Sequence, residues 1–394
     1  MNDERQGLSP ASGAWRMTDP AAFRQFADVG ALDLELGGRL PAVRVAYETW
    51  GTPAADGSNV ILVEHALTGD SHAAGPTGPG QPTPGWWDSL IGPGKVIDTD
   101  RWFVVCSNVL GGCQGTTGPA SPAPDGRPYG SRFPRITTRD QVHAEAALAD
   151  VLGIRCFAAV IGGSMGGMRA LEWLVMYPER VRSAVLLATC ATASADQIGT
   201  QTAQIHAITS DPGWRGGDYH DAGPGQGPHV GLGVARRFAH LTYRTDAELQ
   251  LRFGSDAQRG ENPLGPAAAG ISPDGGRFAV QSYLDHHADK LVDRFDAGTY
   301  VVLSDAMNTH DVYRNRPEDV LASVTVPVRV AGLDSDRLYP LRQQRELAER
   351  IAGCPGLDVI ETPFGHDGFL IEVEPVGRIV ADLLDRVADD HAVC

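Results

Sequence analysis

The chain has 394 residues, of which 42% are hydrophobic and 21% are charged, a composition typical of a globular protein with one large domain or a core carrying an insertion. Its formal net charge of −16 argues against nucleic acid or an anionic membrane surface as the main partner. No apolar stretch is long enough to span a membrane, and the N-terminus lacks the basic-then-apolar pattern of a signal peptide. The six scattered cysteines contain no Cys-x-x-Cys pair, which indicates reduced thiols in a cytoplasmic protein and no zinc site.

The first half of the chain predicts alternating strands and helices. LDLELGG and VRVAYETWG form an expected hairpin through Gly37-Gly38, and NVILVEHA reads as a buried strand. Thr138 and Gln141 fit a capping box at the start of a helix that ends at Gly153. Further expected elements are a strand at 101–109, a strand ending at Ile161, a helix after Ser164 and a strand at 183–189. This alternation predicts a mostly parallel sheet covered by helices on both faces.

The alternation stops near Cys190 and returns only near residue 326. Residues 191 to about 310 are mostly helical or rich in glycine and proline, with no clear strand. A strand at 326–333, a helix from Pro340, a strand in LDVIET and a helix from about Pro375 follow. We therefore expect an α/β fold whose sheet is interrupted by a helical lid. The expected divisions are an N-terminal tail at 1–30, a first core part at 31–190, the lid at 191–312 and a second core part at 313–394.

The stretch VIGGSMGGMRALEW contains a candidate nucleophile, Ser164. An apolar strand precedes the Gly-x-Ser-x-Gly motif, and a helical pattern follows it, which is the context of a nucleophile elbow. The dipole of the helix N-terminus favours negative charge that develops at this position. The alternative is an ordinary strand-to-helix turn in which serine is simply small enough.

A serine hydroxyl needs a base and an orienting acid, which follow it in the order Asp/Glu, His in this type of fold. In the second core part only His366 and His391 are available, and His366 follows the last predicted strand whereas His391 lies four residues from the chain's end. The acid is Asp334 or Asp336 in AGLDSDRLYP, and local chemistry hardly separates the two.

An oxyanion hole requires two backbone N–H groups. One is expected from Met165, the residue after the nucleophile, and the other from Leu67 or a neighbour in HALTG. The loops HALTGDSHAAGPTGPGQPTPGWW and NVLGGCQGTTGPASPAPDGRPYG are long and directly follow strands. Loops of this length are usually functional or disordered, and ligands bind at the carboxyl ends of parallel strands.

Several motifs together resemble homoserine O-acetyltransferases of methionine biosynthesis, especially the actinobacterial type. They span about residues 30–385 and comprise HALTG, NVLGGCQGTTGP, GGSMGGMRALEW, GLGVARRFAHLTYR, SYLDHHADKLVDRFD and FGHDGFL. The resemblance implies an α/β-hydrolase fold with a helical lid, a homodimer paired through the lids, and no cofactor beyond acetyl-CoA as acyl-donor substrate. It implies that Ser164 is the nucleophile, Asp336 the acid and His366 the base.

The resemblance also implies that Arg236, Tyr243 and Asp367 recognise the acceptor, homoserine. A guanidinium binds a carboxylate in a bidentate manner, and an aspartate beside the base can take the ammonium. Without the resemblance, Arg236 and Arg237 read as a solvated basic pair on an amphipathic helix.

Alternatives stay open at this point: a succinyl donor, a serine acceptor, a serine esterase that uses water, and a non-catalytic binding protein. The chain departs from the usual family pattern at Ala120, His286, His287, Ala288 and Tyr313. These departures leave the triad intact and bear on specificity and lid packing.

Overall fold

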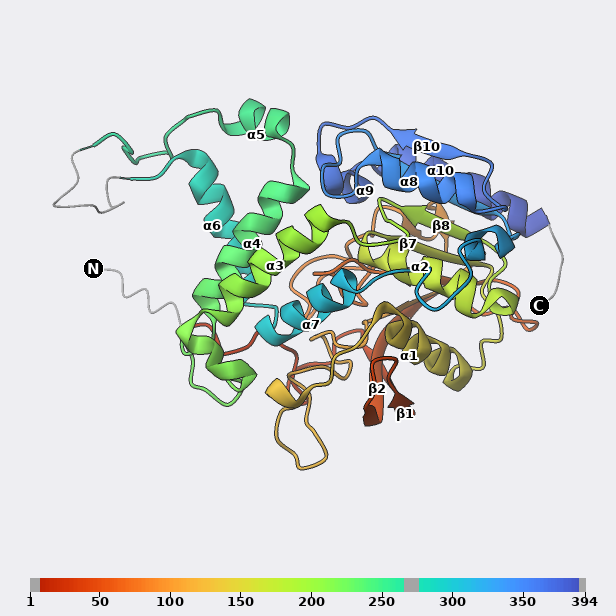
Figure 1. Ribbon diagram of the computed structural model, residues 1–394, viewed down its shortest axis with the longest axis horizontal. Helices are drawn as coiled ribbons and strands as arrows, with labels where there is room; N and C mark the ends of the chain where they lie inside the picture. Colours follow the sequence, from red (N-terminus) through yellow and green to blue (C-terminus); the bar gives the residue numbers. More distant parts are fainter. Residues whose placement is uncertain (1–7, 266–275, 390–394) are drawn as a thin grey trace.

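The computed structural model describes residues 8–265 and 276–389, and its centre is an eight-stranded sheet in the order β1-β2-β6-β3-β7-β8-β9-β10 (Figure 1). The pairs β1–β2 and β2–β6 are antiparallel and all the other pairs are parallel, as the alternating pattern predicts. The strands are β1 (Gln25–Asp33), β2 (Arg39–Trp50), β3 (Val60–Glu64), β6 (Phe103–Ser107), β7 (Ala159–Gly163), β8 (Ala184–Leu187), β9 (Val328–Leu333) and β10 (Leu357–Ile360). Two short strands that the sequence did not indicate, β4 (Ile91–Gly92) and β5 (Ile97–Asp98), form a separate parallel pair.

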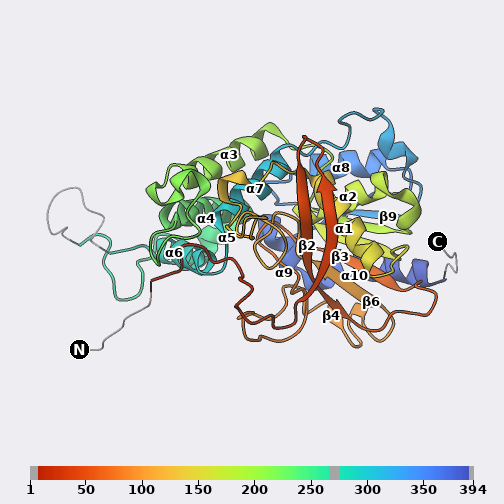
Figure 2. The same ribbon diagram turned by 90° about the horizontal axis from the view of Figure 1, so that it is seen from below.

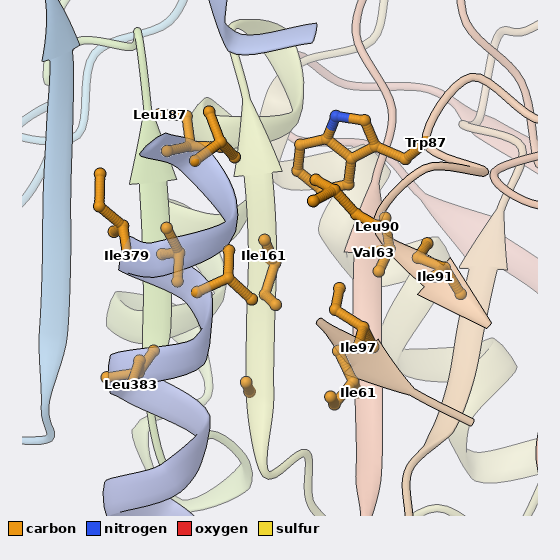
Figure 3. Packing of buried hydrophobic residues seen from close by; sticks show 14 of the residues in the cluster. Ile61, Val63, Trp87, Leu90, Ile91, Ile97, Ile161, Leu187, Ile379 and Leu383 are labelled. Atoms are coloured by element: carbon orange, nitrogen blue, oxygen red, sulfur yellow. The ribbon is translucent and has the colours of Figure 1, made fainter. Parts of the chain in front are cut away.

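Helices cover both faces of the sheet because the strand residues alternate between two apolar surfaces. Val60 and Leu62 pack on one side with α1, α2 and α8, whereas Ile61 and Val63 pack on the other side with α10. Figure 3 shows this second layer, in which Ile379 and other α10 side chains lie against the strands. The core helices are α1 (Thr138–Val151), α2 (Met165–Met176), α8 (Leu341–Arg350), α9 (Gly368–Ile371) and α10 (Val373–Asp389).

Between β8 and β9 lies a helical insertion, which we define as residues 195–308. It forms its own body beside the sheet in Figures 1 and 2. Its helices are α3 (Ala195–Thr209), α4 (His229–Tyr243), α5 (Asp246–Phe253), α6 (Ala279–Val292) and α7 (Ala297–Asn308). Met165 and Met168 of the core pack into the same apolar cluster as Leu232 and Leu291 of the insertion. The insertion therefore meets the core at α2, directly beside Ser164.

An N-terminal segment contacts both the core, where the Trp15 N–H donates to the Cys113 carbonyl (2.9 Å), and the insertion. The Ser12 hydroxyl donates to Asp296 (2.7 Å), which also accepts from Tyr219 (2.6 Å) and lies 3.1 Å from the His220 ring. The Asp296 side chain is fully buried. Because this segment is packed and β1 begins at Gln25, the expected tail at 1–30 is only partly a tail, and the expected boundary falls inside β1.

Two other sequence expectations need correction. The capping box of α1 consists of Thr137 and Asp140, one residue before the predicted pair Thr138 and Gln141, because the side chain that reaches back belongs to the third helical residue. Cys156 is disulfide-bonded, so the expectation of reduced thiols throughout is wrong for this residue. Sequence spacing does not reveal which cysteines the fold brings into range. His391 lies outside the described residues.

The two long loops after β3 and β6 are built into the protein rather than lying over its surface. Buried residues occur in both loops: Ser71, Ala73 and Trp87 in the first, and Leu110 and Thr116 in the second.

Within the described residues, no helix is both long and apolar enough to cross a membrane.

Candidate active site

Ser164 lies between the last residue of β7 and the first residue of α2, in a backbone conformation that side chains rarely adopt (φ 56°, ψ −123°). Such a residue costs about 1–3 kcal/mol and persists only where its surroundings hold it. Here the Ser164 N–H donates to the carbonyl of Leu187 (2.9 Å), and the Thr189 hydroxyl donates to the Ser164 carbonyl (2.9 Å). The strained turn is therefore held by the end of the neighbouring strand β8 and by the segment that follows it.

Two glycines explain why the motif has its spacing. A Cβ on Gly162 would lie 2.3 Å from the carbonyl oxygen of Gly166, and a Cβ on Gly166 would lie 2.2 Å from that of Glu64. Side chains at these positions would force α2 away from the sheet. The glycines thus let the helix start directly against β3 and β7, with Ser164 at its N-terminus.

The structure brings Ser164, His366 and Asp336 together in one hydrogen-bonded chain. His366 Nε2 lies 2.9 Å from Ser164 Oγ, and His366 Nδ1 lies 2.7 Å from Asp336 Oδ2. All three residues are less than a tenth exposed. The geometry matches that of a serine nucleophile with a base and an orienting acid.

Asp336 and Asp334, which the sequence hardly separated, have different contacts. Asp336 Oδ1 accepts from the backbone N–H groups of Leu338 (2.8 Å) and Tyr339 (2.9 Å), which leaves Oδ2 for His366. Asp334 is exposed and accepts from the Thr362 N–H (3.0 Å), so it joins the loops after β9 and β10. Asp336 is therefore the candidate acid.

The ring of Tyr339 stacks on that of His366, with centroids 4.9 Å apart and planes 22° apart. Tyr339 is buried, so it fixes the imidazole plane without hydrogen-bonding to either ring nitrogen that the triad uses. Sequence reasoning missed this role, although Tyr339 lies in the quoted AGLDSDRLYP, because stacking depends on the path of the loop.

Met165 and Leu67, the expected oxyanion donors, lie in the same buried apolar cluster at the carboxyl edge of the sheet. Met165 is the first residue of α2, and the N–H of a first helical residue has no partner within its own helix. Arg169 of α2 donates to the carbonyl of His65 (2.6 Å), two residues before Leu67. This contact holds the loop after β3 against the nucleophile helix, and it was not anticipated from the sequence.

Arg236 and Tyr243, the expected acceptor-binding residues, lie two turns apart on α4 and face the triad. The Arg236 guanidinium lies 5.9 Å from the centre of the Tyr243 ring, which in turn lies 5.8 Å from the His366 ring. Arg236 Nη1 donates to the Thr68 hydroxyl (3.4 Å), while its buried Nε has no hydrogen-bond partner among the described residues. By contrast, Arg237 forms an ion pair with Asp285. The interpretation of both arginines as a solvated basic pair therefore holds for Arg237 and not for Arg236.

Asp367 follows His366 directly and keeps part of its carboxylate accessible. Its side chain is 22% exposed, and Oδ2 lies 3.4 Å from Arg244 Nη1. An anion, Asp367, thus adjoins the His366 base in sequence, and a cation, Arg236, lies on the far side of the Tyr243 ring that contacts His366. This arrangement can hold a zwitterion whose reacting group points at His366.

The departures from the family pattern fall mainly on the helical insertion. The His287 ring packs against the His240 ring, with centroids 4.1 Å apart and planes tilted by 34°. Burial together with the charge of Arg236 lowers the pKa of His287 to about 4. Ala288 is buried against α4, and Tyr313 packs under Arg350. Nothing in the structure explains His286, or Ala120, which is partly buried near the insertion.

Within residues 8–265 and 276–389, no three His, Cys, Asp or Glu side chains are grouped so as to hold a metal ion.

Comparisons with known proteins agree with this geometry. The family model described as the alpha/beta hydrolase fold matches residues 59–373. A homoserine O-acetyltransferase of Thermobifida fusca (strain YX) is 59% identical over 378 residues, covering 95% of this chain and 97% of the relative. Among solved structures, a homoserine O-acetyltransferase from Bacillus anthracis aligns with a TM-score of 0.82 and 27% identity, over 93% of this chain and 98% of that structure's chain. Esterase E22 (TM-score 0.81, 27% identity) covers 92% of this chain and 100% of its own.

Proposed function

The chain belongs to the α/β-hydrolase-fold family and, within it, to the homoserine O-acetyltransferases, and on that premise we propose that it moves the acetyl group of acetyl-CoA onto the hydroxyl of L-homoserine. The product is O-acetyl-L-homoserine, a precursor for methionine biosynthesis. The observation that carries the proposal is the hydrogen-bonded chain Ser164–His366–Asp336 beside Arg236 and Asp367.

In the first half-reaction, His366 Nε2 takes the proton of Ser164 as Oγ attacks the thioester carbonyl of acetyl-CoA. The negative charge that develops on the carbonyl oxygen is stabilised by the N–H groups of Met165 and Leu67. The carbon–sulfur bond then breaks, the imidazolium returns its proton to the CoA sulfur, and an acetyl ester remains on Ser164. Asp336 keeps Nδ1 protonated throughout and stabilises the imidazolium.

In the second half-reaction, homoserine replaces CoA. His366 takes the proton of the homoserine hydroxyl, whose oxygen attacks the acetyl carbon, and the same N–H groups stabilise the second oxyanion. The bond to Ser164 Oγ breaks, Oγ regains the proton from His366, and the acetyl ester of homoserine leaves. The enzyme returns to its starting state, so this is a ping-pong mechanism with one acyl site.

Selection of homoserine over water rests on binding groups that an esterase does not need. Arg236 binds the homoserine carboxylate, Asp367 binds its ammonium, and Tyr243 closes the space between Arg236 and the base. Holding the acceptor hydroxyl at the base raises its effective concentration far above that of a freely diffusing alcohol.

The second candidate function is ester hydrolysis, which the similarity to esterase E22 favours. The same triad serves both reactions, and only the acceptor of the acetyl group differs. Succinyl transfer and transfer to serine use the same chemistry with a longer donor or a shorter acceptor.

The deciding experiment follows thiol release from acetyl-CoA or succinyl-CoA, each with homoserine, with serine and without an amino acid. We expect sustained release over many turnovers only with acetyl-CoA and homoserine together. When homoserine is omitted, we expect a single turnover of CoA release and a Ser164 acetyl adduct by rapid-quench mass spectrometry. Release that is indifferent to homoserine would favour the esterase and overturn the transferase.

We also propose that the chain forms a homodimer through its helical insertion. Four apolar side chains, Val230, Val234, Phe238 and Leu241, are exposed along one face of α4 at spacings of four, four and three residues. Exposed apolar stripes of this kind mark protein–protein contacts, and a two-fold axis lets one stripe pack on its copy.

Because acetyl-CoA is an intracellular donor, we also propose that the enzyme acts in the cytoplasm, which cell fractionation tests.

A further inference from the structure

The Asp367 carboxylate, which we propose binds the ammonium of the acceptor, also contacts a second cation, Arg244. Arg244, the residue that follows α4, reaches it at 3.4 Å, a distance longer than that of a well-formed ion pair. The two other donors of Arg244 are taken by Glu248 of α5, with Nε at 3.1 Å and Nη2 at 2.7 Å. Glu248 thus binds Arg244 in a bidentate manner and leaves only Nη1 for Asp367.

This pair is buried and docked against the loop that carries His366. The side chains of Glu248 and Arg244 are 4% and 9% exposed. Thr245, between them, donates its hydroxyl to the Pro363 carbonyl (2.6 Å), and the Arg244 guanidinium lies 5.2 Å above the ring of Phe364. Arg244 is therefore held at a set place relative to Asp367 by both α5 and the loop that carries His366.

The charges in this cluster balance one another. Burial alone would raise the pKa of Glu248, but hydrogen bonds from Arg244 and Arg252 outweigh it and lower that pKa, so Glu248 is a carboxylate at neutral pH. Arg252 also donates to Glu248, at 2.8 Å from the outer side. Two guanidinium groups are thus matched by the carboxylates of Glu248 and Asp367.

Arg244 and the ammonium of the acceptor compete for the same carboxylate. If Arg244 were free, it would form its own bidentate pair with Asp367, and the ammonium would have to displace it. We propose that Glu248 is a positioning residue for acceptor specificity: by occupying Arg244, it keeps the Asp367 carboxylate available to the ammonium of an amino-acid acceptor. This inference rests on the proposed function, because it needs an acceptor that carries an ammonium.

The variant Glu248→Gln tests the inference. The amide has one oxygen and no charge, so it releases a donor group of Arg244 toward Asp367. We expect the KM for homoserine to rise about tenfold, which corresponds to about 1.4 kcal/mol. The single-turnover release of CoA without homoserine, which does not involve Asp367, should keep most of its rate.

Two controls separate this effect from general damage. The variant Asp285→Asn removes a carboxylate that pairs with Arg237 and Arg277 in the same insertion but does not contact Asp367, and it should leave the homoserine KM within about twofold. As a second control, 4-hydroxybutanoate has the carboxylate and hydroxyl of homoserine but no ammonium. Its inhibition constant should be the same for Glu248→Gln and for the unaltered protein.

The double variant Arg244→Gln/Glu248→Gln decides between positioning and a merely structural role. Without the Arg244 charge, Asp367 is no longer masked, so we expect the homoserine KM to fall back toward the unaltered value. A double variant with a higher KM than the single one, or an unchanged KM in Glu248→Gln, would overturn the inference alone. Absence of homoserine-dependent CoA release in the unaltered protein would overturn the proposed function, and the inference with it.

Discussion

The variant Asp336→Asn should inactivate the enzyme by reversing the hydrogen bond to His366. The N–H groups of Leu338 and Tyr339 both point at Oδ1, so the Asn oxygen must stay there and its NH₂ group must face His366 Nδ1. An NH₂ group donates and cannot accept. The imidazole then carries its proton on Nε2, the nitrogen that has to accept the proton of Ser164.

The size of the effect follows from the loss of the base in the correct tautomer. In serine enzymes with this arrangement, the same exchange lowers kcat about 10⁴-fold, which corresponds to about 5.4 kcal/mol of transition-state stabilisation. We expect a loss of about 10³- to 10⁴-fold here, measured as homoserine-dependent CoA release at saturating donor. The opposite orientation of the Asn amide would leave two buried N–H groups facing an NH₂ group, at a cost of about 1–3 kcal/mol for each unpaired group.

The matched control is Asp334→Asn, two residues earlier in the same loop. Asp334 is exposed and bonds the Thr362 N–H, so this variant should keep kcat within a few-fold and lose only part of one hydrogen bond. Melting temperatures of both variants would show that each is folded. If Asp336→Asn keeps more than a tenth of the activity, or if both variants lose it equally, the assignment of the acid is wrong.

Three further predictions concern packing, pH and assembly. Gly166→Ala places a methyl group 2.2 Å from the carbonyl oxygen of the last β3 residue, so it should displace α2 and lower the rate of CoA release about hundredfold. The control Gly199→Ala, whose methyl group meets open space, should keep its rate. Equal rates for the two variants would contradict the packing argument. Burial alone would raise the pKa of Asp296, but the charge of His220 and the hydrogen bonds from His220, Tyr219 and Ser12 lower this pKa from 3.8 to about 2. Because the pKa in the folded state lies below that in the unfolded state, Asp296 contributes about 2 kcal/mol to the free energy of unfolding above pH 4. This contribution is lost as the pH falls to 2. Urea unfolding of Asp296→Asn should therefore show a deficit of that size at pH 7 that disappears near pH 2, and a deficit independent of pH would refute this account. Phe238→Glu puts a charge in the exposed α4 stripe and should halve the mass measured by sedimentation, whereas an unchanged mass would locate the dimer contact elsewhere.

Local sequence patterns predicted most of the fold. The run before Gly162 and the helical spacing after Ser164 predicted β7 and α2, since an apolar strand and an amphipathic helix each have their own period. The expected order nucleophile, acid, base singled out His366, because each residue had to follow a strand at the same edge of a parallel sheet. Boundaries were less certain: the capping box of α1 was expected one residue late, since Thr137 and Thr138 are both able to cap.

What only the tertiary structure decided are choices between neighbours and contacts between distant segments. Local chemistry hardly separates Asp334 from Asp336, and the family resemblance alone pointed to Asp336. The backbone N–H groups around Asp336 Oδ1 supply the physical reason for that choice. Glu248 lies four residues after Arg244, which is an ordinary helical spacing. The effect of this pair on Asp367 could not be predicted, because Asp367 lies 123 positions after Arg244 in the sequence. Periodicity and motifs in the sequence depend on interactions between residues that are close along the chain. Which side chain faces a given carboxylate depends on where separate loops end in space, and that is settled only when the sheet and the insertion pack together.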